Sequence, residues 1–85
     1  MARPWNAIIA ASEAIGQTYM QAFGLSPEIW EIIRHDASTM GKRFERVVVI
    51  RPHWQMDAYE HEMFERQLRE QWHTLVSVTG SLNVI

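Results

Sequence analysis

Residues 4–23 read PWNAIIAASEAIGQTYMQAF, and the interpretation of this stretch decides the fold of the whole chain. It contains a single charged side chain, Glu13. Large apolar side chains recur in it at the i, i+3, i+4, i+7 spacing of an amphipathic helix. They are Trp5, Ile8, Ile9, Ile15, Tyr19 and Phe23. Because Pro4 suits a first turn and Gly24 a helix end, the pattern predicts one helix over residues 4–23.

The same predicted helix has a second surface, made of small side chains. They are Ala7, Ala10, Ala11, Ala14 and Thr18. Small side chains allow another backbone to come close, and a domain of 85 residues rarely has enough chain to cover one helix on both sides. We therefore expect this surface to mediate self-association with a second copy, in the simplest case as a homodimer.

Composition restricts the class of protein. The length predicts a single domain over residues 1–85, and an apolar content of 47% excludes a disordered chain. A net charge of −2 argues against non-specific nucleic-acid binding, and the lack of cysteine excludes disulfides and thiolate metal sites. No run approaches the roughly 20 apolar residues needed to span a bilayer. We expect a cytoplasmic protein without membrane contact, in the host cytoplasm if its origin is viral.

The middle of the chain changes character. Ser26 and Pro27 form a start signal for a second helix, which we expect over residues 27–40. The β-branched run Val47–Ile50 then predicts a strand over residues 44–50 that is covered on both faces, because it shows no alternation.

The last third of the chain predicts a third helix and a second strand. Asp57 and Glu60 have the spacing of a capping box, and the apolar pattern continues to at least Trp72. A short strand within residues 75–85 would pair with the strand at 44–50, whose backbone groups need partners. The expected fold is a small α+β domain in the order α-α-β-α-β, with a small sheet packed against helices.

A basic stretch is the strongest candidate for a binding surface. Its residues are Lys42, Arg43, Arg46, Arg51, His53 and Trp54. Trp and Arg are the residue types that dominate binding hot spots, and Trp54 lies outside the apolar helix stripes. Three interpretations remain open: charges that protect a strand edge from aggregation, a site for an acidic protein partner, and a contact with a phosphate backbone.

No pattern identifies a catalytic, metal or cofactor site. Glu70 and His73 have an i, i+3 spacing found in di-iron bundles, and Asp57, His61 and Glu65 share one helix face. These residues belong to a charged, solvated face, and a bundle site also needs carboxylates from facing helices. The four glycines are dispersed, so the chain lacks a glycine-rich phosphate loop. We expect no enzyme activity, no cofactor and no metal.

The sequence therefore favours a small, non-enzymatic, self-associating protein that binds another protein as an inhibitor or adaptor. Such compact chains occur in viruses and mobile elements. Two alternatives stay open. One is a structural subunit of a larger assembly such as a virion. The other is a DNA-binding regulator that uses the basic stretch over residues 42–53, although nucleic acid is the less favoured partner because no predicted helix offers a row of exposed basic or amide side chains.

Overall fold

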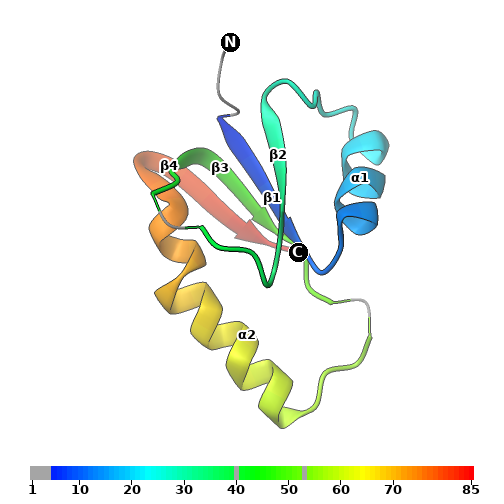
Figure 1. Ribbon diagram of the computed structural model, residues 1–85, viewed down its shortest axis with the longest axis vertical. Coiled ribbons are helices and arrows are strands. Elements are labelled where there is room, and N and C mark those ends of the chain that lie inside the picture. The colour runs from blue at the N-terminus through cyan, green and yellow to red at the C-terminus, as the bar shows by residue number, and fades with distance from the viewer. Residues whose placement is uncertain (1–4, 40, 53) are drawn as a thin grey trace.

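The computed structural model describes residues 5–39, 41–52 and 54–85, and it shows a four-stranded parallel sheet with two helices (Figure 1). The strands lie in the order β2-β1-β3-β4. The expected order α-α-β-α-β is wrong, because the elements follow one another as β-α-β-β-α-β. In chain order they are β1 (Asn6–Ala10), α1 (Glu13–Ala22), β2 (Trp30–Arg34), β3 (Phe44–Val49), α2 (Ala58–Glu70), the short 3-10 helix η1 (Trp72–Leu75) and β4 (Val76–Val84).

The first correction concerns residues 4–23, which do not form one helix. Asn6–Ala10 is a central strand, β1, whose five residues are all buried and which pairs with β2 on one side and β3 on the other. The helix α1 begins only after Ser12, whose hydroxyl accepts a hydrogen bond from the Ile15 N–H. A short, continuous apolar run fits a strand covered on both faces as well as it fits a helix. The run over residues 7–10 is such a strand.

The second correction concerns residues 27–40, where the predicted helix is replaced by β2. Ser26 and Pro27 belong to a turn, in which the Ser26 carbonyl accepts hydrogen bonds from the N–H groups of Ile29 and Trp30. The chain then extends through Trp30–Arg34, which pairs in parallel with β1. The β-branched residues of this segment favour a strand, and the sheet position overrides the helix start signal.

The remaining expected elements are present. β3 occupies most of the predicted strand, and β4 pairs with it in parallel from the predicted segment. α2 begins with the predicted capping box, in which Asp57 accepts from the Glu60 N–H and the Glu60 carboxylate accepts from the Asp57 N–H. Its regular turns end at Glu70, before the 3-10 turn of η1.

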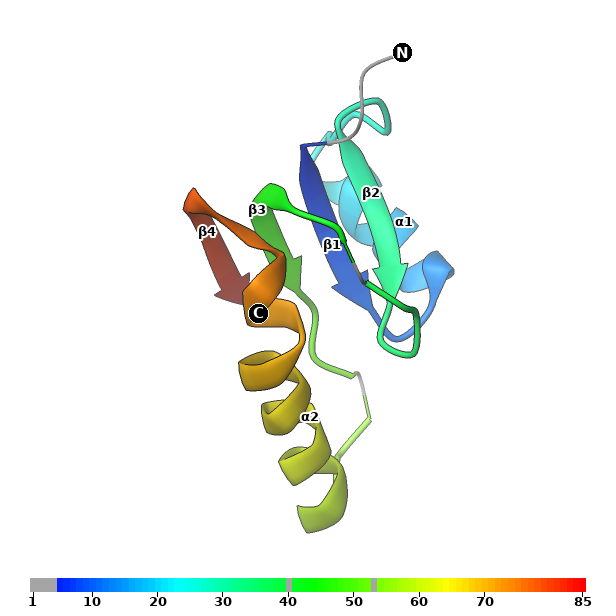
Figure 2. The same ribbon diagram turned by 60° about the vertical axis from the view of Figure 1, so that its left-hand side comes forward.

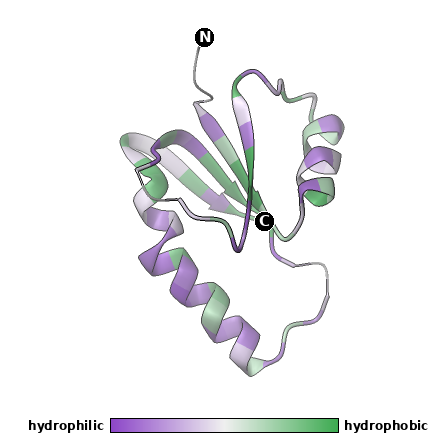
Figure 3. Cartoon of the chain, in the orientation of Figure 1, coloured by the Kyte–Doolittle hydropathy of each residue, from purple (hydrophilic) through white to green (hydrophobic). Residues whose placement is uncertain are grey.

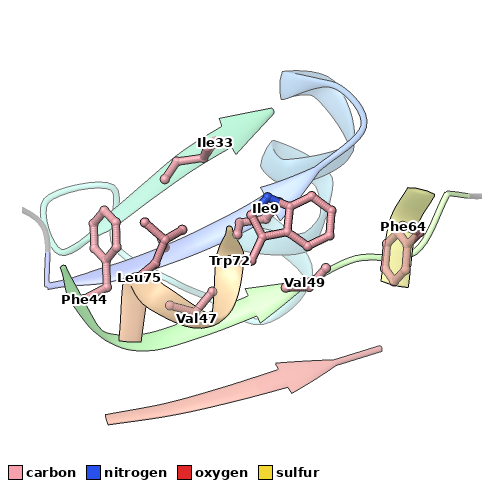
Figure 4. Packing of buried hydrophobic residues seen from close by; sticks show 9 residues of the cluster. Ile9, Ile33, Phe44, Val47, Val49, Phe64, Trp72 and Leu75 are labelled. Atoms are coloured by element: carbon pink, nitrogen blue, oxygen red, sulfur yellow. The ribbon is translucent and has the colours of Figure 1, made fainter. Parts of the chain in front are cut away.

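The two helices cover opposite faces of the sheet, which makes the arrangement doubly wound (Figures 1 and 2). The hydropathy colouring shows apolar central strands between helices whose outer sides are polar (Figure 3). On the α1 face, Met20 and Trp30 pack with Ile8 and Val48. On the α2 face a larger core contains Ala7, Ile9, Ile33, Phe44, Val47, Val49, Phe64, Trp72 and Leu75 (Figure 4).

α2 extends well beyond the sheet. Its C-terminal end and η1 lie against the strands, whereas its N-terminal half projects past the edge at which the strands end (Figures 1 and 2). Figure 4 accordingly shows Trp72 and Leu75 over the strands, and Phe64 beyond the end of β3. Phe64 is the one residue of α2 that is buried. The connection from β3 to α2 runs beside this projecting half of the helix.

Candidate functional site

The carboxyl ends of the parallel strands are the first place to look for a site. β1 leads into α1 on one face and β3 leads toward α2 on the other, so the winding reverses between these neighbouring strands. Open α/β sheets bind ligands at such a reversal. Here the β1–α1 connection is only Ala11 and Ser12, without glycine, and the Ser12 hydroxyl already caps α1. The connection is therefore unlike the glycine-rich loops that cradle phosphates.

His35 lies at the carboxyl end of β2, directly after the strand, and connects three elements. Its Nε2 donates to the Ile50 carbonyl at 3.2 Å, and its own carbonyl accepts from the Gln67 side chain at 2.9 Å. The imidazole ring packs against Trp72, with ring centroids 5.0 Å apart, and edge-on to Phe64 at 6.0 Å. Burial lowers the pKa of His35, partly offset by its hydrogen bond to Ile50 and by the nearby Asp36 carboxylate.

A groove of about 180 Å³ opens next to His35, between α2 and the segment that follows β3. It is lined by His35, Pro52, Met56, Tyr59, Glu60, Met63, Phe64 and Gln67. Most of these side chains are apolar or aromatic. A cavity of about 150 Å³ lined by apolar side chains can hold a benzene ring, so this groove has room for one ring-sized side chain.

Arg51 and Trp54 lie at the rim of this groove. The Arg51 guanidinium is 5.3 Å from the centre of the Phe64 ring, and no carboxylate of the described residues forms an ion pair with it. The Trp54 indole N–H donates to the Glu60 carboxylate at 3.0 Å, so Trp54 is held beside the first turn of α2. Charge and aromatic area therefore flank the groove.

Together these side chains form what we call the projecting surface, defined by Arg51, Pro52, Trp54, Met56, Tyr59 and Met63. Tyr59 is 72% exposed, Trp54 45% and Met63 36%, although all three are large and apolar or aromatic. Tyr59 and Met63 are one helical turn apart on α2 and line the groove from the same side. Clustered exposed apolar side chains of this kind mark interaction sites more often than scattered ones do.

The rest of the predicted basic stretch lies elsewhere. Lys42 and Arg43 precede β3, and roughly 20 Å of strand separates them from Arg51. The Lys42 ammonium forms an ion pair with Glu31 at 2.8 Å, and the Arg43 guanidinium donates to the Thr74 carbonyl at 2.6 Å. Arg46 is exposed on β3 itself.

These residues therefore do not converge with Arg51 and Trp54 on one surface. His53 lies outside the described residues.

The small residues expected to form a self-association surface also separate. Ala7 and Ala10 are 0% exposed in the central strand, where no partner can reach them. Ala11 lies in the β1–α1 connection, and of the five small residues Ala14 and Thr18 alone are exposed side chains of α1. The continuous helix face on which this expectation depended does not exist, because the chain is a strand up to Ala10.

Other kinds of site find little support. Among the described residues, no three His, Asp or Glu side chains gather into a group that could hold a metal ion. The helices in this part of the chain are all too short or too polar to cross a membrane.

Three of the six residues of the projecting surface belong to the apolar pattern of the predicted third helix. Met56, Tyr59 and Met63 follow the same apolar stripe as Phe64 and Leu68, and the stripe predicts that all of them pack against the domain. The stripe is real, but the sheet ends before the helix does. Length alone does not reveal the overhang, because the 13 residues of α2 and the six residues of β3 each span about 20 Å. The helix projects because η1 and the C-terminal end of α2 occupy the length that the sheet covers (Figure 1).

Comparison with protein-family models, with curated proteins and with solved structures found no match for this chain.

Proposed function

We propose that the protein acts by binding another protein, without a reaction of its own, and that the projecting surface is its binding site. The observation that carries this proposal is the cluster of exposed Trp54, Tyr59 and Met63 around a groove whose rim presents Arg51. Trp, Tyr, Met and Arg are the residue types enriched in the centres of protein interfaces.

The rigidity of the surroundings supports this use. The base of the groove is formed by Phe64 and by His35, which hydrogen bonds and ring packing fix between β2, β3 and α2. The capping box and the Trp54–Glu60 hydrogen bond hold the first turn of α2. A surface that is ordered before binding loses less conformational entropy in the complex.

The chemistry of the groove indicates the kind of segment that fits it. The volume of about 180 Å³ takes one aromatic or aliphatic side chain, which would contact Phe64 and Met63. A carboxylate next to that side chain would pair with Arg51, which lies above the Phe64 ring. The proposed partner is therefore a protein segment with an acidic residue beside a large apolar one. Occupying such a segment suits an inhibitor or an adaptor.

A displayed library of random peptides tests the proposal with a defined probe. Selection on the immobilised wild-type chain should enrich peptides that combine an aromatic or aliphatic residue with a neighbouring Asp or Glu. Tyr59→Ala should weaken the binding of a selected peptide by at least roughly tenfold, because alanine substitution at a hot spot costs about 2 kcal/mol or more. Arg51→Glu should weaken the peptides that contain a carboxylate most.

Trp5→Ala is the matched control, because Trp5 is another exposed tryptophan, 59% exposed, which precedes β1 and is remote in sequence from the groove. Trp5→Ala should leave the affinity unchanged. Tyr59 is exposed and is therefore dispensable for folding, so loss of binding in a folded Tyr59→Ala variant reports on the surface itself. Failure to enrich any peptide family, or equal binding by wild type, Tyr59→Ala and Arg51→Glu, would refute the proposal.

A further inference from the structure

β2 is an edge strand, and no strand of residues 5–39, 41–52 and 54–85 pairs with its outer side. On its inner side, the Ile29 carbonyl accepts a hydrogen bond from β1 and the His35 N–H donates one to β1, both at 3.0 Å. Peptide groups alternate in direction along a strand, so Trp30, Ile32 and Arg34 point their N–H and C=O groups outward.

Two of the outward groups are already used within the chain. The Trp30 N–H donates to the Ser26 carbonyl at 3.1 Å, and the Arg34 carbonyl accepts from the Ala37 N–H at 3.0 Å. For the other outward groups, which are both groups of Ile32, the Trp30 carbonyl and the Arg34 N–H, the described part of the chain provides no hydrogen-bond partner. These four groups determine how another strand can pair with the β2 edge.

We propose that this edge pairs with the same edge of a second copy, antiparallel, about a two-fold axis at Ile32. In that register the two Ile32 residues exchange a pair of hydrogen bonds, and each Arg34 N–H donates to the Trp30 carbonyl of the other copy. The two occupied groups, the Trp30 N–H and the Arg34 carbonyl, then lie opposite each other. Every available group finds a partner, and the result is one continuous eight-stranded sheet.

The position of α1 agrees with the same axis. Gly16 lies directly over Ile32, since a Cβ added at Gly16 would be 2.6 Å from an Ile32 methyl carbon. α1 packs across both β1 and β2. With strands about 4.8 Å apart, a helix midway between β1 and β2 would lie about 10 Å from its copy across the axis. Packed helices are 8–10 Å apart, so the two α1 helices would be in contact.

The side of α1 that would face this neighbour is self-complementary. Glu13, Gln17 and Gln21 form a stripe at i, i+4 spacing along an open groove of about 780 Å³ between α1 and β2. Because Gly16 marks the level of the axis, Gln17 faces Gln17 of the second copy. The two-fold operation then brings Glu13 opposite Gln21, where a carboxylate can accept from an amide. The groove is filled by the second helix.

The other edge of the sheet is less suited to pairing. The pairing of β4 with β3 is irregular near its start, because the register shifts between the pairs Phe44–Val76 and Arg46–Ser81. Ser77 and Thr79 donate there to the Glu45 carboxylate, at 2.6 and 2.8 Å. Irregular edges of this kind protect a sheet from pairing with other chains, whereas β2 pairs with β1 without a break. The β2 edge and the side of α1 that faces the groove share no residue with the projecting surface, so this dimer does not depend on the proposed function.

A cysteine placed on the axis gives a direct test, because the chain has no cysteine of its own. Gln17→Cys should form a disulfide between two copies under mild oxidation and run as a species of twice 10.0 kDa. Ala14→Cys is the matched control on the same helix, since Ala14 is exposed but does not line the groove. It should give little cross-linked product. Cross-linking of Ala14→Cys and not of Gln17→Cys would overturn the proposed axis.

A charge on the axis gives a second, independent test. Gln17→Lys places two ammonium groups opposite each other and should raise the dissociation constant of the dimer at least tenfold in sedimentation equilibrium. Ala14→Lys should leave it unchanged. Gln17 is exposed in the single chain, so neither substitution endangers folding. A wild-type chain that stays monomeric at millimolar concentration, or a Gln17→Lys variant that dimerises like wild type, would refute the inference.

Discussion

At the scale of single residues, His35 shows how one side chain can connect a small sheet to its helix. Its ring donates to the Ile50 carbonyl, packs on Trp72 and Phe64, and leaves its own carbonyl to the Gln67 amide. Burial of the ring disfavours its charged form and lowers the pKa of His35 below the ordinary 6.5, although the hydrogen bond to Ile50 and the Asp36 carboxylate act in the opposite direction. The folded state is therefore the state in which His35 resists protonation.

This shift predicts a stability that depends on pH. Well above pH 6.5, His35 is neutral in both states and contributes no pH dependence. As the pH falls below that value, the unfolded chain binds the proton first, so the free energy of unfolding decreases until the folded His35 is also protonated. Urea denaturation between pH 7.5 and 5.5 should show this decrease. His35→Gln should reduce the slope, and His73→Gln, at an exposed position, should keep it; equal slopes in all three would contradict the assignment.

At the scale of elements, the segments with explicit start or end signals were predicted best. The capping box of Asp57 and Glu60 begins α2 as expected, and residues 47–49 of the predicted β-branched run belong to β3. The helix prediction was wrong for residues 7–10 and for residues 30–34, for a common reason. Neither segment alternates strictly between apolar and polar residues, although residues 30–34 include Glu31 and Arg34, and only pairing with a neighbouring strand decides between helix and strand. That information is tertiary and is absent from the local pattern.

The packing of α1 on β2 gives a testable prediction at this scale. Gly16→Ala places a methyl group 2.6 Å from the Ile32 Cγ2, and the β-branched Ile32 is stiff about its first side-chain torsion. Overpacking costs about 1–3 kcal/mol, whereas alanine gains about 0.5–1 kcal/mol of helix propensity, so we expect a net loss of about 1 kcal/mol.

A double-mutant cycle separates the two effects. In an Ile32→Ala background the crowding atoms are gone, and Gly16→Ala should stabilise the protein through helix propensity alone. Chemical denaturation of the four proteins measures the coupling. An identical effect of Gly16→Ala in both backgrounds would show that the close approach to Ile32 is not what requires glycine.

At the scale of the whole molecule, the sequence could identify Arg51 and Trp54 as candidates but not the surface they belong to. Lys42 and Arg43 are their neighbours in sequence, yet β3 places them at the opposite end of the sheet, where Glu31 and Thr74 bind them. Tyr59 joins Trp54 only because α2 extends past the sheet (Figure 1). The strand β3 runs through the basic stretch and therefore divides its residues between two separate regions of the molecule.

Because the sheet covers only one end of α2 (Figure 1), the two ends of this helix should differ in hydrogen-exchange protection. β1 pairs on both sides and is buried between two cores, so its amides exchange only when the whole domain opens. The N-terminal half of α2 has no sheet beneath it, although its backbone is regularly hydrogen-bonded, and it should open locally. We expect the Met63 amide to exchange faster than the Ile8 and Ile9 amides by orders of magnitude, and faster than the Gln71 amide near the covered end of α2. Hydrogen exchange followed by NMR at single-residue resolution measures these rates. Equal protection along all of α2 would contradict this prediction and would mean that the projecting half is held by more than its first-turn cap and Phe64.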